Sequence, residues 1–376
     1  MTRNCKVRGT CVFVLGLGLI ALQSGCPSSE PAKPAKPTDQ AAAPPAAADA
    51  PPVATPAARP ADESAEGLAK APLGLPAVPV PADNPMTAEK IELGKMLYFD
   101  KRLSKDGTIS CATCHDPKMA WAEHEPTSKG IGGQFGQRNS PTVINAAYAT
   151  SQFWDGRAAT LEEQAMGPIA NPIEMGHDLD AMIADLSKLD GYTRQFQKVF
   201  GTKITQEGVA KAIAAFERTV LSGNSPYDRF KAGDKAALSE AQQRGLQLFE
   251  DHCAVCHAPP VFSVFVSYNA GIGMDKEKPD LGRMAVTKKD RDMGKFRVPA
   301  LREVAKTQPY FHDGSVATLE AAVALMAGGG KDNLHLSSQL KAVREANLGV
   351  QERKDLVEFL KALSGEFPVV EPPKLP

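Results

Sequence analysis

Two short stretches of this chain carry the same pattern, in which two cysteines three positions apart are followed directly by a histidine. The first is "ISCATCHDP" at 109–117, and the second is "HCAVCHAPP" at 252–260. Residues i and i+3 share one face of a helical turn, so the two thiols of each stretch point the same way. Any fold of this chain must therefore present two such sites, each with its own histidine.

The segments around the two stretches also resemble each other. "FWDGRAATLEEQA" at 153–165 matches "FHDGSVATLEAAV" at 311–323, and Pro141 in "RNSPTVIN" corresponds to Pro299 in "FRVPALRE". The cysteine motifs lie 142 residues apart and the Phe-x-Asp-Gly motifs 158 residues apart. A unit of about 140 to 160 residues therefore occurs twice, and each copy contains one C-x-x-C-H.

The first 26 residues have the features of an export signal. Basic residues precede an apolar run at 11–22, which is too short to span a bilayer comfortably. The following "LQSGC" resembles a bacterial lipoprotein cleavage site with Cys26 as the acylated residue, although Gln23 stands where an aliphatic residue is usual. We predict a signal peptide at 1–26 with a lipid on Cys26, and keep simple export and an uncleaved anchor as alternatives.

Residues 27–84 are rich in alanine and proline and cannot bury enough apolar surface to fold. We predict a disordered, extended linker that acts either as a tether or as an inert spacer. Once Cys5 and Cys11 leave with the signal and Cys26 carries lipid, every remaining cysteine lies in a C-x-x-C-H stretch. The lack of an odd thiol suits an oxidising compartment.

The rest of the chain has an ordinary globular composition with many helical signals. Thr87 is a predicted N-cap, and Ser239 and Gln242 have capping-box spacing. No convincing run of alternating strand residues is present, so we predict an all-α fold with long loops. The duplication divides this part into domains at 85–228 and 229–376. The formal net charge of −1 argues against a nucleic-acid surface.

The spacing C-x-x-C-H is the recognised attachment pattern of c-type haem. Two thiols on one face can add to the two vinyl groups of a porphyrin, and the next histidine can reach the iron. A zinc site is one alternative, but it needs a second ligand pair about 15 to 20 residues away. A thioredoxin-like dithiol is the other, but it needs a βαβ context that the sequence lacks.

Spacing alone does not fix the last ligand of each iron. Met326 precedes three glycines in "ATLEAAVALMAGGG", and a thioether ligand would raise the potential of its haem and close the iron to substrate. A helical methionine is also a common core residue. Both interpretations of Met326 stay open on this ground.

From about residue 85 onward, the chain resembles the bacterial dihaem cytochrome c peroxidases and the related dihaem enzyme that matures methylamine dehydrogenase. The resemblance rests on "LGKMLYFDKRLSKDGTISCATCH", "GQRNSPTVINAAY", "SQFWDGRAATLEEQAMGPI", "NPIEMG", "GRMAVT" and "TQPYFHDGSVATLEAAVALM". It implies two cytochrome c-like domains, each with one covalently attached haem c. The implied attachment residues are Cys111, Cys114 and His115 for the peroxidatic haem, and Cys253, Cys256 and His257 for the haem that receives electrons.

The resemblance also implies roles for single residues. Met326 matches the axial methionine of the second haem, and it favours the peroxidase branch because the maturing enzyme has tyrosine there. Trp154 matches a tryptophan between the haems, Glu174 a distal acid and Gln164 a distal amide. One carboxylate beside the iron can move a proton between the two oxygens of peroxide. The implied calcium ligands are Asn139 and the carbonyls of Thr307 and Pro309.

The sequence departs from the family pattern in one loop. Many members have a histidine there that caps the peroxidatic iron in the resting state, whereas this chain has Ile131 in "TSKGIGGQFGQRNSPT". Isoleucine cannot bind iron. We therefore expect a permanently open site, with a substitute ligand from His124 as the alternative.

The sequence thus predicts a periplasmic dihaem peroxidase, tethered to the membrane if Cys26 is acylated. Its expected partners are hydrogen peroxide and a small electron-donor protein, either a cytochrome c or a cupredoxin. Its expected cofactors are two haem c groups and calcium, and a homodimer is compatible with the resemblance. The alternatives are a dihaem oxidase that acts on a protein or organic substrate through high-valent iron, and a plain dihaem electron carrier.

Overall fold

The computed structural model describes residues 70–376. The predicted signal peptide, the lipid on Cys26 and the linker up to residue 69 lie outside the described residues. Between residues 70 and 376, no helix has both the length and the apolar character needed to cross a membrane.

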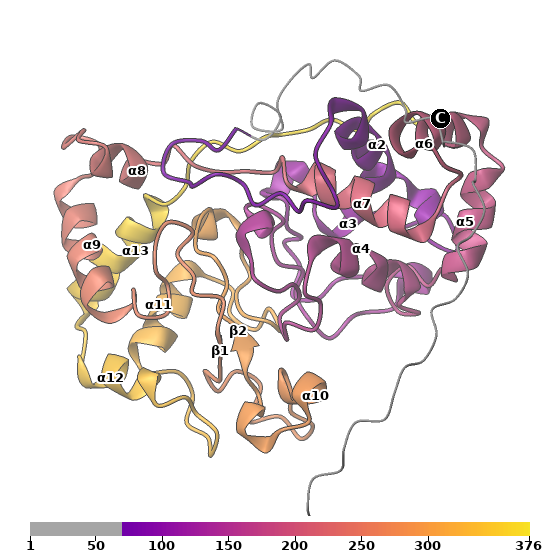
Figure 1. The fold of residues 1–376 in the computed structure, drawn as a ribbon. Coiled ribbons are helices and arrows are strands. Elements are labelled where there is room, and N and C mark those ends of the chain that lie inside the picture. Colours follow the sequence, from indigo (N-terminus) through magenta and orange to yellow (C-terminus); the bar gives the residue numbers. More distant parts are fainter. Residues whose placement is uncertain (1–69) are drawn as a thin grey trace, which may run out of the picture. The chain divides into compact units, whose positions relative to one another are not determined.

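Helices dominate both halves of the described chain (Figure 1). The first half contains α2 (Ala88–Phe99), α3 (Cys111–Cys114), α4 (Leu161–Ala170), α5 (Leu179–Ser187), α6 (Asp190–Phe200) and α7 (Gln206–Glu217). The second half contains α8 (Pro226–Lys231), α9 (Glu240–His252), β1 (Ser267–Tyr268), α10 (Met284–Thr287), β2 (Phe296–Arg297), α11 (Leu319–Ala327), α12 (Gln339–Glu345) and α13 (Val350–Lys361). Short 3₁₀ turns occur at Lys101–Leu103, Pro117–Met119, Ile131–Gly133, Ala146–Tyr148, Asp290–Asp292 and Val304–Lys306.

The two halves share one helix arrangement, in which the first long helix crosses the last. α2 packs against α7 in the first half, and α9 packs against α13 in the second. A glycine lies at each crossing. Gly94 faces the carbonyl of Ala212, and Gly245 faces the carbonyl of Asp355, and neither position has room for a Cβ. The duplication read from the sequence therefore extends to the closest contact of each helix pair.

The repeated Phe-x-Asp-Gly motifs also adopt one backbone shape. Phe153 and Phe311 both lie in the left-handed region, with φ of 66° and 69°. Each motif is closed by an isolated antiparallel bridge and is followed by a helix with a threonine N-cap, Thr160 before α4 and Thr318 before α11. The predicted caps at Thr87 and Ser239 are present as well.

Each half has a hydrophobic core of its own. The buried residues of the first core run from Leu93 to Val220, and those of the second run from Tyr227 to Leu363. The expected domain boundary at 228 and 229 lies close to this division.

Two segments differ from the expectations for fold and boundaries. β1 and β2 form a small antiparallel sheet, which the sequence did not predict. Strands of two residues are too short to give an alternating pattern. Residues 70–84, expected as the end of a disordered linker, pack against both halves. The carbonyl of Gly74 accepts from Nη2 of Arg302 in the second half at 3.2 Å, and that of Pro76 accepts from the hydroxyl of Tyr148 in the first half at 2.8 Å. A proline-rich segment keeps its carbonyl acceptors, so it can be held by hydrogen bonds despite its low apolar content.

The C-terminal segment was expected to belong to the second domain. Instead, Phe367 and Val370 pack against the core of the first half. The indole N–H of the fully buried Trp121 donates to the carbonyl of Pro368 at 2.8 Å. This bond satisfies the polar atom of Trp121 that burial would otherwise leave unpaired.

Candidate functional site

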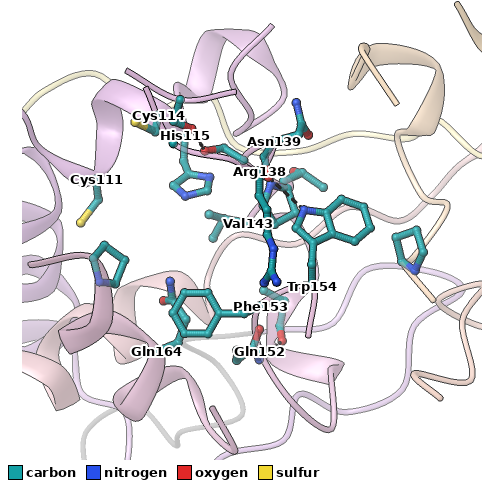
Figure 2. A pocket seen from close by; sticks show the side chains of 18 of the residues that line it. Cys111, Cys114, His115, Arg138, Asn139, Val143, Gln152, Phe153, Trp154 and Gln164 are labelled. Carbon is teal, nitrogen blue, oxygen red and sulfur yellow. Dashed lines mark hydrogen bonds between the residues drawn. The ribbon is translucent and has the colours of Figure 1, made fainter. Parts of the chain in front are cut away.

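One cavity of about 510 Å³ brings together most of the residues predicted for the peroxidatic site. Its size is typical of cofactor pockets, which span roughly 300 to 1,000 Å³. Cys111 and Cys114 begin and end the short helix α3, and His115 follows as its C-cap. Figure 2 shows the side chains of Cys111, Cys114 and His115 close to one another in the wall of the cavity. The residues predicted for the chemistry, Trp154, Gln164 and Glu174, also line it.

The cysteines of this site form no disulfide, and burial raises the pKa of both thiols. Burial raises the pKa of Cys114 to about 12 and shifts that of Cys111 upward as well. A redox dithiol needs the opposite, a lowered thiol pKa. Among residues 70–376, no group of three or more His, Cys, Asp or Glu side chains could hold a metal ion. Neither the dithiol nor the zinc alternative therefore gains support.

Both C-x-x-C-H histidines are neutral, as a metal ligand must be. Burial lowers the pKa of His115 to about 4, although the backbone of Pro141 favours the protonated form. Burial does the same for His257, opposed by the backbones of Phe262 and Pro299. The Nδ1 of His257 lies 3.0 Å from the carbonyl oxygen of Phe262. The corresponding prolines thus take equivalent places beside the two imidazoles.

Gln164 and Glu174 line the cavity but belong to segments other than α3. Gln164 projects from α4 into the cavity opposite His115 (Figure 2). Glu174 is half-buried, and the Nδ2 of Asn171 donates to its Oε1 at 3.0 Å. Burial raises the pKa of Glu174, while Arg157 and Asn171 partly oppose that shift. A carboxyl of this kind can exchange a proton closer to neutral pH than an exposed glutamate can.

Ile131 lies on a loop that is fixed to the segment carrying Glu174. The N–H of Ile131 donates to the carbonyl of Glu174 at 2.8 Å. Gly130 lines the cavity and touches the backbone of Ile173 and Glu174 so closely that a Cβ would not fit. The alternative ligand, His124, has its Nε2 3.0 Å from the carbonyl oxygen of Lys306. Its ring is therefore held by the second half in this structure.

Trp154 lies where the two halves meet at the cavity. Its indole N–H donates to the carbonyl of Asn139 at 2.9 Å, and its own carbonyl accepts from the Arg297 N–H at 2.7 Å. Next to it, Arg138 forms ion pairs with Asp155 at 2.7 Å and with Asp280 at 2.7 Å. These contacts join both halves around the indole.

The three residues predicted to bind calcium line this same cavity. Asn139 is buried, and its Nδ2 donates to the carbonyl of Glu125 at 2.9 Å. The hydroxyl of Thr307 donates to the carbonyl of Val304. A calcium ion at Asn139, Thr307 and Pro309 stays a prediction.

The ligands predicted for the second haem do not line this cavity. Cys253 and Cys256 are free thiols, and burial raises the pKa of Cys253 to about 12. Met326 is half-buried in the last turn of α11. Whether its thioether is a ligand or a core group is therefore still a prediction.

Sequence reasoning missed five charged residues of the cavity wall, namely Arg138, Asp155, Arg157, Glu217 and Arg297. Arg157 acts on Glu174, Glu217 ends α7, and Arg297 comes from the second half. Glu217 is buried, and its Oε2 has no hydrogen-bond partner among the described residues. Burial raises its pKa to about 8. The signal available was a charged residue inside an apolar helix face, in "VAKAIAAFERTV".

Comparison with known families agrees with this geometry. Residues 88–236 match the family model described as di-haem cytochrome c peroxidase, and residues 242–364 match that of cytochrome c. The chain belongs to the dihaem cytochrome c peroxidase family. The resemblance predicted from the sequence motifs is thus confirmed.

Members of the family from several bacteria are similar over most of this chain. Cytochrome-c peroxidase IdrP1 of Denitromonas iodatirespirans is 40% identical, with 83% of this chain and 92% of that protein covered. Cytochrome c551 peroxidase of Nitrosomonas europaea is 40% identical, with 80% and 87% covered. Methylamine utilization protein MauG of Methylorubrum extorquens is 38% identical, with 80% and 85% covered.

A solved structure supports the fold. The crystal structure of a MauG-like protein associated with microbial copper homeostasis has a TM-score of 0.71 and 34% identity. It covers 79% of this chain and 95% of that one. Two cytochrome c-type domains, rich in helix and poor in strand, are therefore the architecture of the described residues.

The residues of the cavity fit the haem c that the family implies. Cys111 and Cys114 form no disulfide and share one turn, and His115 is neutral, with a buried Nδ1 that has no hydrogen-bond partner among residues 70–376. The cavity extends beyond them toward Gln164 and Glu174, so a flat group could lie between the two sets.

Proposed function

We propose that this chain reduces hydrogen peroxide to water with electrons from a small redox protein. The observation that carries the proposal is a single cavity lined by Cys111, Cys114 and His115 and also by Gln164 and Glu174. Attachment and acid–base residues thus face the same space. The relatives named as cytochrome c peroxidases support this activity.

Glu174 and Gln164 would transfer protons to the peroxide and hold it in place. When bound, haem c supplies the redox chemistry, and the protein supplies ligands, orientation and protons. The reaction H₂O₂ + 2 H⁺ + 2 e⁻ → 2 H₂O is helped by a side chain that first accepts and then returns a proton. Glu174 suits this role, because burial raises its pKa toward working pH. The amide of Gln164 would hold the peroxide, and Ile131 would offer no second protein ligand to a bound iron.

Electrons would enter at the second haem, which we propose is held by Cys253, Cys256, His257 and Met326. Trp154 would carry them between the halves. Its backbone and indole are hydrogen-bonded to residues of both halves, which supports a fixed bridge.

The location and the calcium ion complete the proposal. The export signal predicted at residues 1–26 supports a periplasmic enzyme, held at a membrane if Cys26 is acylated. A calcium ion bound by Asn139, Thr307 and Pro309 would sit beside Trp154, because Asn139 also accepts the indole hydrogen bond.

Stopped-flow mixing with peroxide tests the function. The oxidised holoprotein should react at once, because Ile131 cannot block the iron, and peroxide should then oxidise a reduced small cytochrome c or cupredoxin. A protein inert toward peroxide in every redox state would leave only the electron-carrier alternative. A reaction seen only after half-reduction would contradict the open site but not the peroxidase activity.

A further inference from the structure

Arg297 belongs to the second half, and it lines the cavity that contains Cys111, Cys114 and His115 of the first half. It lies on β2, where its backbone N–H donates to the carbonyl of Trp154 at 2.7 Å. Its Nε donates to the carbonyl of Phe153 at 3.3 Å. The guanidinium carbon lies 5.4 Å from the ring centroid of Phe265. The guanidinium of Arg297 therefore contacts a main-chain carbonyl and lies near an aromatic ring.

Arg297 is distinguished from the other arginines of the cavity wall by its lack of an acid. Arg138 and Arg157 both form ion pairs with Asp155, at 2.7 and 3.0 Å. Arg297 forms no ion pair with any residue between 70 and 376, and burial alone lowers its pKa to about 10. Arg297 is half-buried, and a guanidinium that loses water without gaining an anion is destabilised. The cavity therefore offers a positive charge that the described protein does not neutralise.

Carboxylate is the anion that best matches the planar fork of arginine, which binds it through two parallel hydrogen bonds. Haem carries two propionate groups, and the same cavity contains the three residues expected to attach a haem. We propose that Arg297 binds a propionate of the haem attached to Cys111 and Cys114. This inference rests on haem attachment at those cysteines, as described under the proposed function.

The binding would make Arg297 a positioning residue for the bridge between the halves. Its backbone and Nε already hold the carbonyls of Trp154 and Phe153. A propionate on the remaining guanidinium nitrogens links the first haem, β2 of the second half and the indole of Trp154. The alternative is that Arg297 only braces this main chain, in which case its charge has no effect on the haem.

The reduction potential of the first haem separates these two roles. We would titrate the holoprotein spectroelectrochemically as wild type, Arg297→Gln and Arg297→Lys. Arg291→Gln is the matched control, because Arg291 is exposed on the same segment. A further variant, Met326→Ala, assigns the signals on the proposal that Met326 binds the second iron, since the haem whose potential it leaves unchanged is then the first one.

Loss of the positive charge leaves the propionate uncompensated and favours the ferric state. In Arg297→Gln we expect the first haem to be harder to reduce by about tenfold in its equilibrium constant, or about 59 mV for one electron. Arg297→Lys keeps the charge and should shift the potential by less than half as much. Arg291→Gln should not differ from wild type.

Several results would overturn the proposal. Equal shifts in Arg297→Gln and Arg297→Lys, no shift in either, or a shift confined to the other haem would each do so. If Arg297→Gln fails to retain haem, retention in Arg297→Lys supports the charge pairing, and loss in both refutes it. Because potentials need no peroxide, a protein without peroxidase activity would defeat the proposed function and leave this test intact.

Discussion

The buried carboxyl of Glu217 should make this protein less stable as pH rises through the neutral range. Its side chain is only 6% exposed, and its Oε2 has no hydrogen-bond partner among the described residues. Arg218 favours ionisation of Glu217 but is itself paired with Glu162 at 2.8 Å. Burial dominates and raises the pKa from 4.5 to about 8. The folded chain therefore keeps a proton that the unfolded chain releases.

The size of the effect follows from this difference in pKa. Each unit corresponds to about 1.36 kcal/mol, so keeping Glu217 protonated at pH 7.5 costs about 4 kcal/mol of unfolding free energy. The sign is set by proton binding. Between the ordinary pKa of 4.5 and the raised value near 8, the folded state binds more protons, so stability falls as pH rises.

Glu217→Gln isolates this contribution, because the amide is neutral in both the folded and the unfolded state. Urea unfolding of both holoproteins, followed by circular dichroism, should give similar stabilities near pH 5 and a variant more stable by about 4 kcal/mol near pH 7.5. Glu207→Gln is the control, since Glu207 is exposed on the same helix and pairs with Lys211. A difference that does not change with pH would refute the reasoning.

Three further predictions concern the site and the core. Glu174→Gln should lower peroxide turnover by about 10²-fold or more with both haems still attached, as measured by steady-state kinetics and haem content; unchanged turnover would contradict its role. The oxidised protein should show a high-spin haem by electron paramagnetic resonance because of Ile131, and two wholly low-spin haems would count against an open site. Arg302→Met should destabilise the fold by about 3 to 5 kcal/mol in urea, because it leaves Asp228 buried without its partner at 2.7 Å; a loss below about 1 kcal/mol would show that Asp228 finds another.

Local sequence signals predicted much of the architecture. The helix starts at Thr87 and Ser239 could be recognised because a helix cap depends on only a few adjacent residues. The duplication could be recognised because matching motifs require no knowledge of contacts. It extended to Gly94 and Gly245, whose shared role became visible only once the helices were seen to cross.

Features that depend on distant parts of the chain could not be predicted in the same way. Arg297 of the second half lines the cavity that contains Cys111, Cys114 and His115. It lies on a two-residue strand, which is too short to show a periodic pattern. A glutamate is expected at the surface from its residue type alone, and only the packing of the helices shows that Glu217 is buried. The roles of Met326 and of the calcium residues rest on resemblance, because neither has a spacing pattern of its own.

The return of residues 366–371 to the first half has a consequence for biosynthesis. Trp121 can complete its hydrogen bond, and Phe367 can fill its place in the first core, only after nearly the whole chain has left the ribosome. The half that is made first is therefore finished last. A nascent first half should therefore lack the partner of the Trp121 indole and the packing of Phe367 until the second half has been made.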